Sequence, residues 1–96
     1  MTSVVVKPST KSDKKLMAIF TLQDGKTKTV HFGQRGADDF TKTKNKAQKE
    51  RYLNRHRARE NWNDPFSKGA LSRWILWHLP TQTASIKDFK RRFKFK

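Results

Sequence analysis

The sequence has no cysteine, and hydrophobic residues make up only 33% of its 96 positions. Without cysteine the chain can form neither a disulfide framework nor a thiolate metal site, which is compatible with a reducing compartment. The four glycines do not lift the apolar share to the roughly 45–50% that is usual for soluble domains. A small core must therefore hold together a large charged surface.

Long apolar runs are also missing. The longest is Trp74-Ile75-Leu76-Trp77, far short of the roughly 20 residues that a membrane-spanning helix needs. Val4-Val5-Val6 is too short for the apolar region of a signal peptide. We therefore expect no signal peptide and no transmembrane segment.

Acidic residues are scarce beside basic ones, and the formal net charge is +15. Residues 1–43 carry eight Lys or Arg against four Asp or Glu, whereas residues 44–96 carry fifteen against four. Solubility of a small domain needs a net charge of only about 2–8. The excess predicts an anionic partner: nucleic acid, an anionic membrane surface, or an acidic protein surface.

The length predicts one small domain over residues 1–96, and the strand and helix patterns described below predict the α+β class. We expect a partly irregular N-terminal segment over 1–15, a β-hairpin over 16–33, a helical part with about three helices over 45–93, and a basic tail over 94–96.

Two β-rich runs, Leu16–Leu22 and Thr27–Phe32, flank Asp24-Gly25. An Asp-Gly pair in that place is typical of a two-residue hairpin turn, because both central residues need positive φ. A hairpin alone is marginal in water, so we expect Val4–Val6, which precedes Pro8, to add a third strand. With a two-residue loop, one apolar face is expected to lie under the helices: Met17, Ile19, Val30 and Phe32.

Gly33-Gln34-Arg35-Gly36 connects the hairpin to the helical part. It lacks the Lys-Ser/Thr that follows the glycines of a phosphate-binding loop, so it predicts turns with positive φ. The neighbouring Asp38-Asp39 pair is expected to be solvated, because adjacent carboxylates do not converge on one point.

Asn45 followed by Gln48 resembles a capping box and predicts a helix that runs to about Glu60. Arg51, Arg55 and Arg59 repeat every four residues along it. Unpaired like charges at this spacing destabilise a helix slightly. A solvated face would tolerate that cost, but a ridge that contacts an anionic partner explains the repeat better.

Asp64-Pro65 predicts the N-cap and first residue of a second helix, over Phe66–His78. This segment is apolar on nearly all sides, which predicts a buried central helix that ends before Pro80.

Thr81 or Thr83 is expected to cap a last helix with Ile86, Phe89 and Phe93 on one face. The basic residues of this helix and of the end of the chain exceed what the helix dipole explains. We predict that they contact the anionic partner: Lys87, Lys90, Arg91, Arg92, Lys94 and Lys96.

The three histidines lie in separate predicted elements, with no cysteine nearby and no nucleophile beside a base. We expect no catalytic site, no metal and no cofactor. Trp62, Trp74 and Trp77 could be stacking platforms for unpaired bases, docking residues for a protein, or core anchors. The shortage of other large apolar residues favours the core for Trp74.

Several motifs occur together in one order: Phe32-Gly33-x-x-Gly36-x-x-Asp39-Phe40-Thr41, Arg51-Tyr52-Leu53-x-Arg55-His56, Glu60-Asn61-Trp62, Ser72-x-Trp74-x-Leu76-Trp77-x-x-Pro80-Thr81, Ser85-Ile86-x-Asp88 and Arg92-Phe93. The series resembles a family of small, basic, largely uncharacterised proteins encoded by giant DNA viruses of algae and protists. The resemblance covers roughly residues 15–93. It departs at Phe40, where tyrosine is expected, at Leu79, which follows His78 where a polar pair is usual, and at Lys94-Phe95-Lys96, which extends the end. It implies a viral setting but no activity.

We therefore predict a non-enzymatic structural protein of the virion, present in the host cell during assembly. As a minor capsid protein it would dock on acidic or aromatic surfaces of other capsid proteins through its arginines and tryptophans. The alternative is a sequence-nonspecific nucleic-acid-binding protein that packages the genome. A basic adaptor on an anionic membrane is a third, weaker hypothesis.

Overall fold

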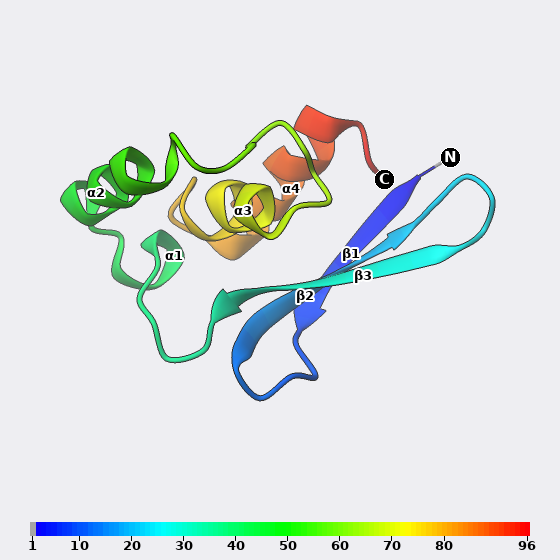
Figure 1. Ribbon diagram of the computed structural model, residues 1–96, viewed down its shortest axis with the longest axis horizontal. Helices are drawn as coiled ribbons and strands as arrows, with labels where there is room; N and C mark the ends of the chain where they lie inside the picture. The colour runs from blue at the N-terminus through cyan, green and yellow to red at the C-terminus, as the bar shows by residue number, and fades with distance from the viewer. Residues whose placement is uncertain (1) are drawn as a thin grey trace.

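The computed structural model describes residues 2–96. Three antiparallel strands come first, β1 (Ser3–Pro8), β2 (Lys14–Thr21) and β3 (Thr27–Gln34), in the sheet order β1-β2-β3. The helical elements follow: α1 (Phe40–Thr43), α2 (Lys46–His56), α3 (Lys68–Leu71), the π-helical segment η1 (Ser72–Leu76) and α4 (Gln82–Phe93). The helices lie on one side of the sheet, with α2 farthest from β1 (Figure 1). The predicted α+β fold with a third strand is confirmed.

Across residues 2–96, no helix combines the length and apolar character that a membrane span requires.

The hairpin forms around Asp24-Gly25, but its loop has three residues instead of two. The Gly25 N–H donates to the Leu22 carbonyl at 3.0 Å, and the Leu22 N–H donates to the Lys26 carbonyl at 2.8 Å. Gly25 has φ +86°. This arrangement is a turn closed by a left-handed residue, the usual form of a three-residue hairpin loop.

The extra loop residue shifts the pairing by one, so that Ala18 lies opposite Val30 and Leu16 opposite Phe32. A shift of one residue moves every side chain of a strand to the other face. Val30 and Phe32 are buried as predicted, but Met17 and Ile19 are on the opposite face from them. The residues of β2 that face the helices are instead Leu16, Ala18 and Phe20.

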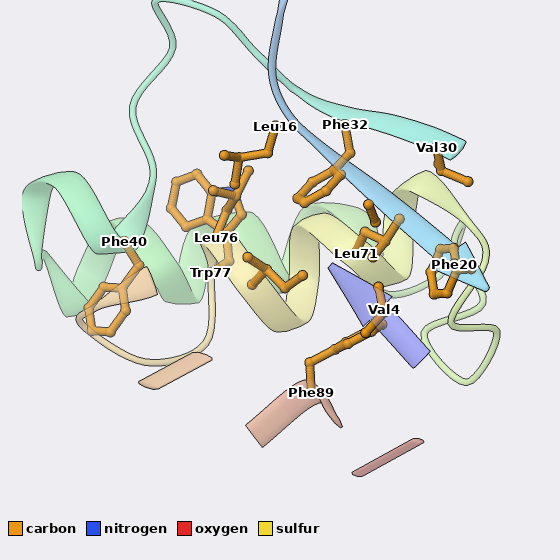
Figure 2. Close-up of a cluster of buried hydrophobic side chains, with 12 residues drawn as sticks. Val4, Leu16, Phe20, Val30, Phe32, Phe40, Leu71, Leu76, Trp77 and Phe89 are labelled. Carbon is orange, nitrogen blue, oxygen red and sulfur yellow. The ribbon is translucent and has the colours of Figure 1, made fainter. Parts of the chain in front are cut away.

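The core lies between this face and the helical elements (Figure 2). Val4 and Phe20 from the sheet, Leu71 and Ile75 from the α3–η1 segment, and Phe89 from α4 are all at most 1% exposed. The α3–η1 segment is thus the buried central helix that was predicted. Its start was not predicted correctly.

Ser67, not Asp64, is the N-cap of α3: its hydroxyl accepts from the Ala70 N–H at 3.1 Å. Asp64 instead accepts from the Phe66 N–H at 3.0 Å and forms a local turn that includes Pro65. Aspartate and serine are both common at helix N-caps and in turns, so the residue types alone do not show which of the two begins the helix.

Asn45 caps α2 as predicted, accepting from the Gln48 N–H at 3.0 Å. The helix ends at His56, before the expected Glu60. The chain turns there, and the Glu60 carboxylate accepts from the Trp62 indole N–H at 3.1 Å. Glu60 also lies so close to Gly69 that a Cβ on Gly69 would be 2.9 Å from its Cδ. These contacts join the turn to α3.

Thr81 caps α4 through a 3.2 Å hydrogen bond from the Ala84 N–H, and Phe89 is buried as expected. The residues predicted as a basic tail belong to the fold. Phe95 packs 5.3 Å from Phe20 and 5.9 Å from Phe89, measured between ring centroids. Lys96 bonds β1 through its backbone, donating to the Thr2 carbonyl at 3.2 Å and accepting from the Val4 N–H at 3.0 Å.

The predicted positive φ occurs at Gly33, near the end of β3, and at Gly36, in the connection after it. The expectation that both following aspartates are solvated is wrong for Asp39, which is 3% exposed. Its carboxylate lies 2.5 Å from the Lys15 ammonium and accepts from the Lys42 N–H at the start of α1. A buried ion pair and a helix cap therefore explain Asp39.

Candidate binding surface for an anionic partner

The cations predicted to contact an anionic partner lie in two regions of the surface. The first is on and just after α2, and the second is on α4 and the residues after it. All are exposed except Lys90, which is half-buried. They are Arg51, Arg55 and Arg59 in the first region, and Lys87, Lys90, Arg91, Arg92, Lys94 and Lys96 in the second.

The predicted arginine ridge is only partly helical. Arg51 and Arg55 lie one turn apart on α2, but Arg59 lies in the turn beyond the end of the helix, where its N–H donates to the His56 carbonyl. Within residues 2–96, no carboxylate approaches the guanidinium of any of the three within 4.0 Å. Their charges are free to meet a partner.

A cleft of about 420 Å³ lies beside the ridge. There the end of the β2–β3 hairpin that is opposite its turn faces α2 and the α3–η1 segment. We call it the α2 cleft. Besides Lys15, which is paired with Asp39, three cations line it from three separate parts of the chain: Lys14 from β2, Arg55 from α2 and Lys68 from α3. Tyr52 and Trp77 provide aromatic walls.

The aromatic walls form a stack of three rings. Tyr52 lies 4.3 Å from Trp77 with the planes 6° apart, and 4.2 Å from His56 with the planes 26° apart. Burial and the nearby Glu60 charge raise the pKa of Tyr52, so its phenol stays protonated. Because both faces of Tyr52 are covered and Trp77 is only 9% exposed, neither ring offers a free face to a base.

A second hollow of about 330 Å³ adjoins the α2 cleft and adds Gln48 and Arg51 to the lining. The two share Asp38, Tyr52, Arg55 and Trp77. Together they form a depression that extends along α2 from the start of α3 to Arg51.

Most of the acidic groups at the cleft already have partners. Asp39 pairs with Lys15, and Glu60 lies 3.1 Å from His56 Nδ1 while accepting from the Trp62 indole. Across the described residues, Lys14 and Lys68 have no carboxylate within 4.0 Å. The remaining charge of the lining is therefore positive.

Trp62 and Trp74 contact two arginines, Arg73 of η1 and Arg92 of the second region. Arg73 lies 5.2 Å from the centre of the Trp62 ring and 4.2 Å from that of Trp74, while Arg92 lies 3.8 Å from Trp74. The Trp74 indole N–H donates to the Trp62 carbonyl at 2.8 Å. The contacts with the two arginines are cation–π interactions, and they favour a packing role for Trp62 and Trp74.

Arg73 is half-buried, and it is one of the residues that the sequence patterns did not single out. Burial lowers its pKa, and the charges of Arg92 and Arg57 lower it further. It lies between Ser72 and Trp74 in a helix that is otherwise largely apolar, so the sequence pattern indicated a buried helix and did not mark Arg73 as a candidate site residue. An arginine beside a tryptophan in such a helix is the signal that would have marked it.

The carboxylate of Asp88, on α4, lies close to three basic side chains. It lies 2.9 Å from His78 Nε2 and 3.5 Å from Arg92, and it accepts a hydrogen bond from Arg91. Burial on its own would raise the pKa of Asp88, but the Arg91 hydrogen bond and the charges of His78, Arg91 and Arg92 bring it below the usual value. Two of the predicted cations, Arg91 and Arg92, are thus partly neutralised within the chain itself.

His78 predicts a loss of stability in mild acid. Burial is the main cause that lowers its pKa; the Asp88 charge opposes this effect, while the charges of Arg73, Lys49 and Arg92 add to it, and the net shift is downward. Because the folded state disfavours the protonated ring, stability is fully present above about pH 6.5 and falls as the pH drops below that value.

The melting temperature should therefore decrease between pH 7 and pH 5, and the decrease should be smaller in His78→Gln. His31→Gln is the control and should keep the wild-type slope. An unchanged slope in His78→Gln would show that other groups cause the acid sensitivity.

Among residues 2–96, no group of three or more His, Cys, Asp or Glu side chains is placed to hold a metal ion.

Comparison with protein-family models gives one match, over residues 4–56, which is a little more than half of the chain. It is described as a family of unknown function (DUF5754). The matched segment contains β2, β3, α1 and α2, with Arg51, Arg55 and Tyr52, and ends where α2 ends. No curated protein and no solved structure matches the chain.

Proposed function

We propose that this chain, which belongs to the DUF5754 family of unknown function, is a non-enzymatic structural protein of a giant-virus particle. It acts as a minor capsid protein whose cations dock on acidic surfaces of neighbouring capsid proteins. The observation that carries the proposal is that the backbone segments bearing its cations are folded and packed. We call these segments the frame, because they hold the cations in fixed positions. The viral setting comes from the resemblance described above.

The C-terminal residues are the clearest part of that frame. A protein that condenses a genome profits from a mobile basic tail, which adapts to any arrangement of phosphates. Here Phe95 packs into the aromatic cluster and the Lys96 backbone bonds β1. Cations in fixed positions favour a partner whose acidic groups are also fixed, since such complementarity sets register and specificity.

The second candidate is sequence-nonspecific nucleic-acid binding. Exposed, unpaired Arg51, Arg55 and Arg59 favour it, because guanidinium groups bind phosphates readily. The covered faces of Tyr52 and Trp74 weigh against it, since proteins that bind single strands use free aromatic faces for stacking.

A salt series separates the two candidates. Binding of the purified chain to duplex and single-stranded DNA is measured from low to physiological salt. We expect the affinity to fall linearly on logarithmic axes and binding to be lost near physiological salt. Sub-micromolar DNA binding at physiological salt would favour the genome-binding protein. Absence of the chain from purified particles of the virus that encodes it would overturn the capsid role.

The arginine ridge gives a second test. Replacing Arg51, Arg55 and Arg59 together by alanine should weaken association with nuclease-treated capsid shells by about tenfold, because free charges at an interface contribute a few tenths to one kcal/mol each. The charge-matched control replaces Lys7, Lys11 and Lys26, which are exposed on and near the sheet. Equal losses in both variants would mean that net charge, not the ridge, governs the association.

A further inference from the structure

We infer that the α2 cleft and its adjoining hollow are the docking site for an extended acidic segment of the partner protein. Its carboxylates lie against Arg51, Arg55 and Lys68, and one of its apolar side chains enters the hollow beside Trp77. This inference rests on the proposed function, because it says where on the chain the acidic partner binds.

The size and shape of the depression suit a peptide. Hollows of about 420 Å³ and 330 Å³ fall within the range of about 300–1,000 Å³ that is typical of ligand sites. Because the two share the Tyr52–Trp77 wall, the space is elongated along α2. An extended chain fills such a space better than a single compact ion does.

The charges select an acidic occupant. Lys14, Arg51, Arg55 and Lys68 border the depression without a carboxylate partner within the described part of the chain. These four cations come from three separate elements, so an occupant that touches all of them must span the site. A segment with several Asp or Glu residues meets this requirement.

Asp38 gives the site a further preference. It lines both hollows and lies 3.7 Å from Lys42. A carboxylate placed next to it would be repelled. The part of the occupant at this point should therefore be neutral, with the acidic residues on either side of it.

The aromatic stack argues for a peptide and against a nucleic acid. Tyr52 is sandwiched between His56 and Trp77 and cannot stack on a base. The ring edges of Tyr52 and Trp77 can instead contact an aliphatic or aromatic side chain. The walls thus match one apolar residue between acidic ones.

The test uses a fluorescein-labelled peptide with glutamates on both sides of a central phenylalanine, and fluorescence anisotropy of the full chain at physiological salt. Arg55→Gln combined with Lys68→Gln removes two cations from the cleft. Lys7→Gln combined with Lys26→Gln removes two exposed cations on and near the sheet, outside both cationic regions. We expect about tenfold weaker binding for the cleft variant and less than about threefold for the control. Melting curves verify that both variants fold.

Equal weakening of the two variants would overturn the cleft as the site and leave docking on acidic surfaces standing. Failure of the wild-type chain to bind the peptide, or any other acidic polypeptide, would overturn the proposed function itself. Displacement of the peptide by a short single-stranded DNA, with the DNA affinity reduced in the cleft variant alone, would assign the cleft to nucleic acid and overturn the inference.

Discussion

Replacing Asp39 by alanine is expected to lower the free energy of unfolding by about 3–5 kcal/mol, a large part of the stability of a domain this small. The side chains of Asp39 and Lys15 are 5% and 16% exposed, and their charged groups lie 2.5 Å apart. Without the carboxylate, the Lys15 ammonium stays largely buried with only the Ala37 carbonyl beside it. Urea denaturation followed by circular dichroism measures the loss.

A matched variant, Asp39→Asn, separates the charge of Asp39 from its capping role. The amide oxygen that it introduces can still accept from the Lys42 N–H, so α1 keeps its N-cap and only the ion pair is lost. We expect this variant to be about 1 kcal/mol more stable than Asp39→Ala, the usual value of a cap. Adding Lys15→Met to Asp39→Asn should recover stability, because no buried charge remains. A loss below about 1 kcal/mol in Asp39→Ala would contradict a buried pair.

Asp39 also shows where prediction from sequence reaches its limit. Asp38 and Asp39 are chemically identical neighbours, yet Asp38 is exposed and Asp39 is buried. What distinguishes them is Lys15, 24 residues earlier in the chain. Local composition carries no information about a partner that tertiary structure brings there.

The sheet was predicted down to the position of its turn but not to its register. Asp24-Gly25 marks the turn, and β-rich runs mark the strands on either side of it. A loop of two residues and one of three are both compatible with Asp-Gly, since either needs a residue with positive φ. The difference of one residue decided which side of β2 faces the core.

A single helix cap was predicted correctly only where one candidate stood alone. Asn45 caps α2 as expected, whereas α4 had two candidates, Thr81 and Thr83, of which the structure uses Thr81. Asp64 and Ser67 lie three residues apart and both favour the role, and the structure uses Ser67. The early end of α2 depends on contacts of Glu60 with Trp62 and Gly69, which no helical pattern encodes.

The cations were predicted as a set, whereas the cleft was not predicted at all. Its charged lining comes from β2, α2 and α3, so it exists only after the hairpin, α2 and the central helix have packed together. Lys14 and Lys68 carry no pattern in the sequence that would single them out from the other lysines. The resemblance described in the sequence analysis implied no activity, so it could not supply them either.

Removing Phe95 and Lys96 is expected to lower the free energy of unfolding by about 2–4 kcal/mol. Full burial of a phenylalanine side chain contributes about 1.5–3 kcal/mol, and Phe95, which is half-buried, contributes part of that amount. Each of the two backbone hydrogen bonds of Lys96, to Thr2 and Val4, contributes about 0.5–1.5 kcal/mol. Phe95 contacts the rings of Phe20, Phe66 and Phe89, so its loss opens the core next to the sheet.

Lys96→Ala is the matched control for this truncation, since it removes the same side-chain charge but keeps Phe95 and the backbone bonds. It should unfold at nearly the same urea concentration as the wild-type chain. A truncated chain as stable as Lys96→Ala would show that these residues are a tail after all. Binding of the acidic peptide then separates the two roles: a structural segment weakens binding only as the chain unfolds, whereas a contact segment weakens it in a fully folded chain. The bonds to β1 favour the structural role, because Lys96 occupies an edge that would otherwise be open for pairing with another strand.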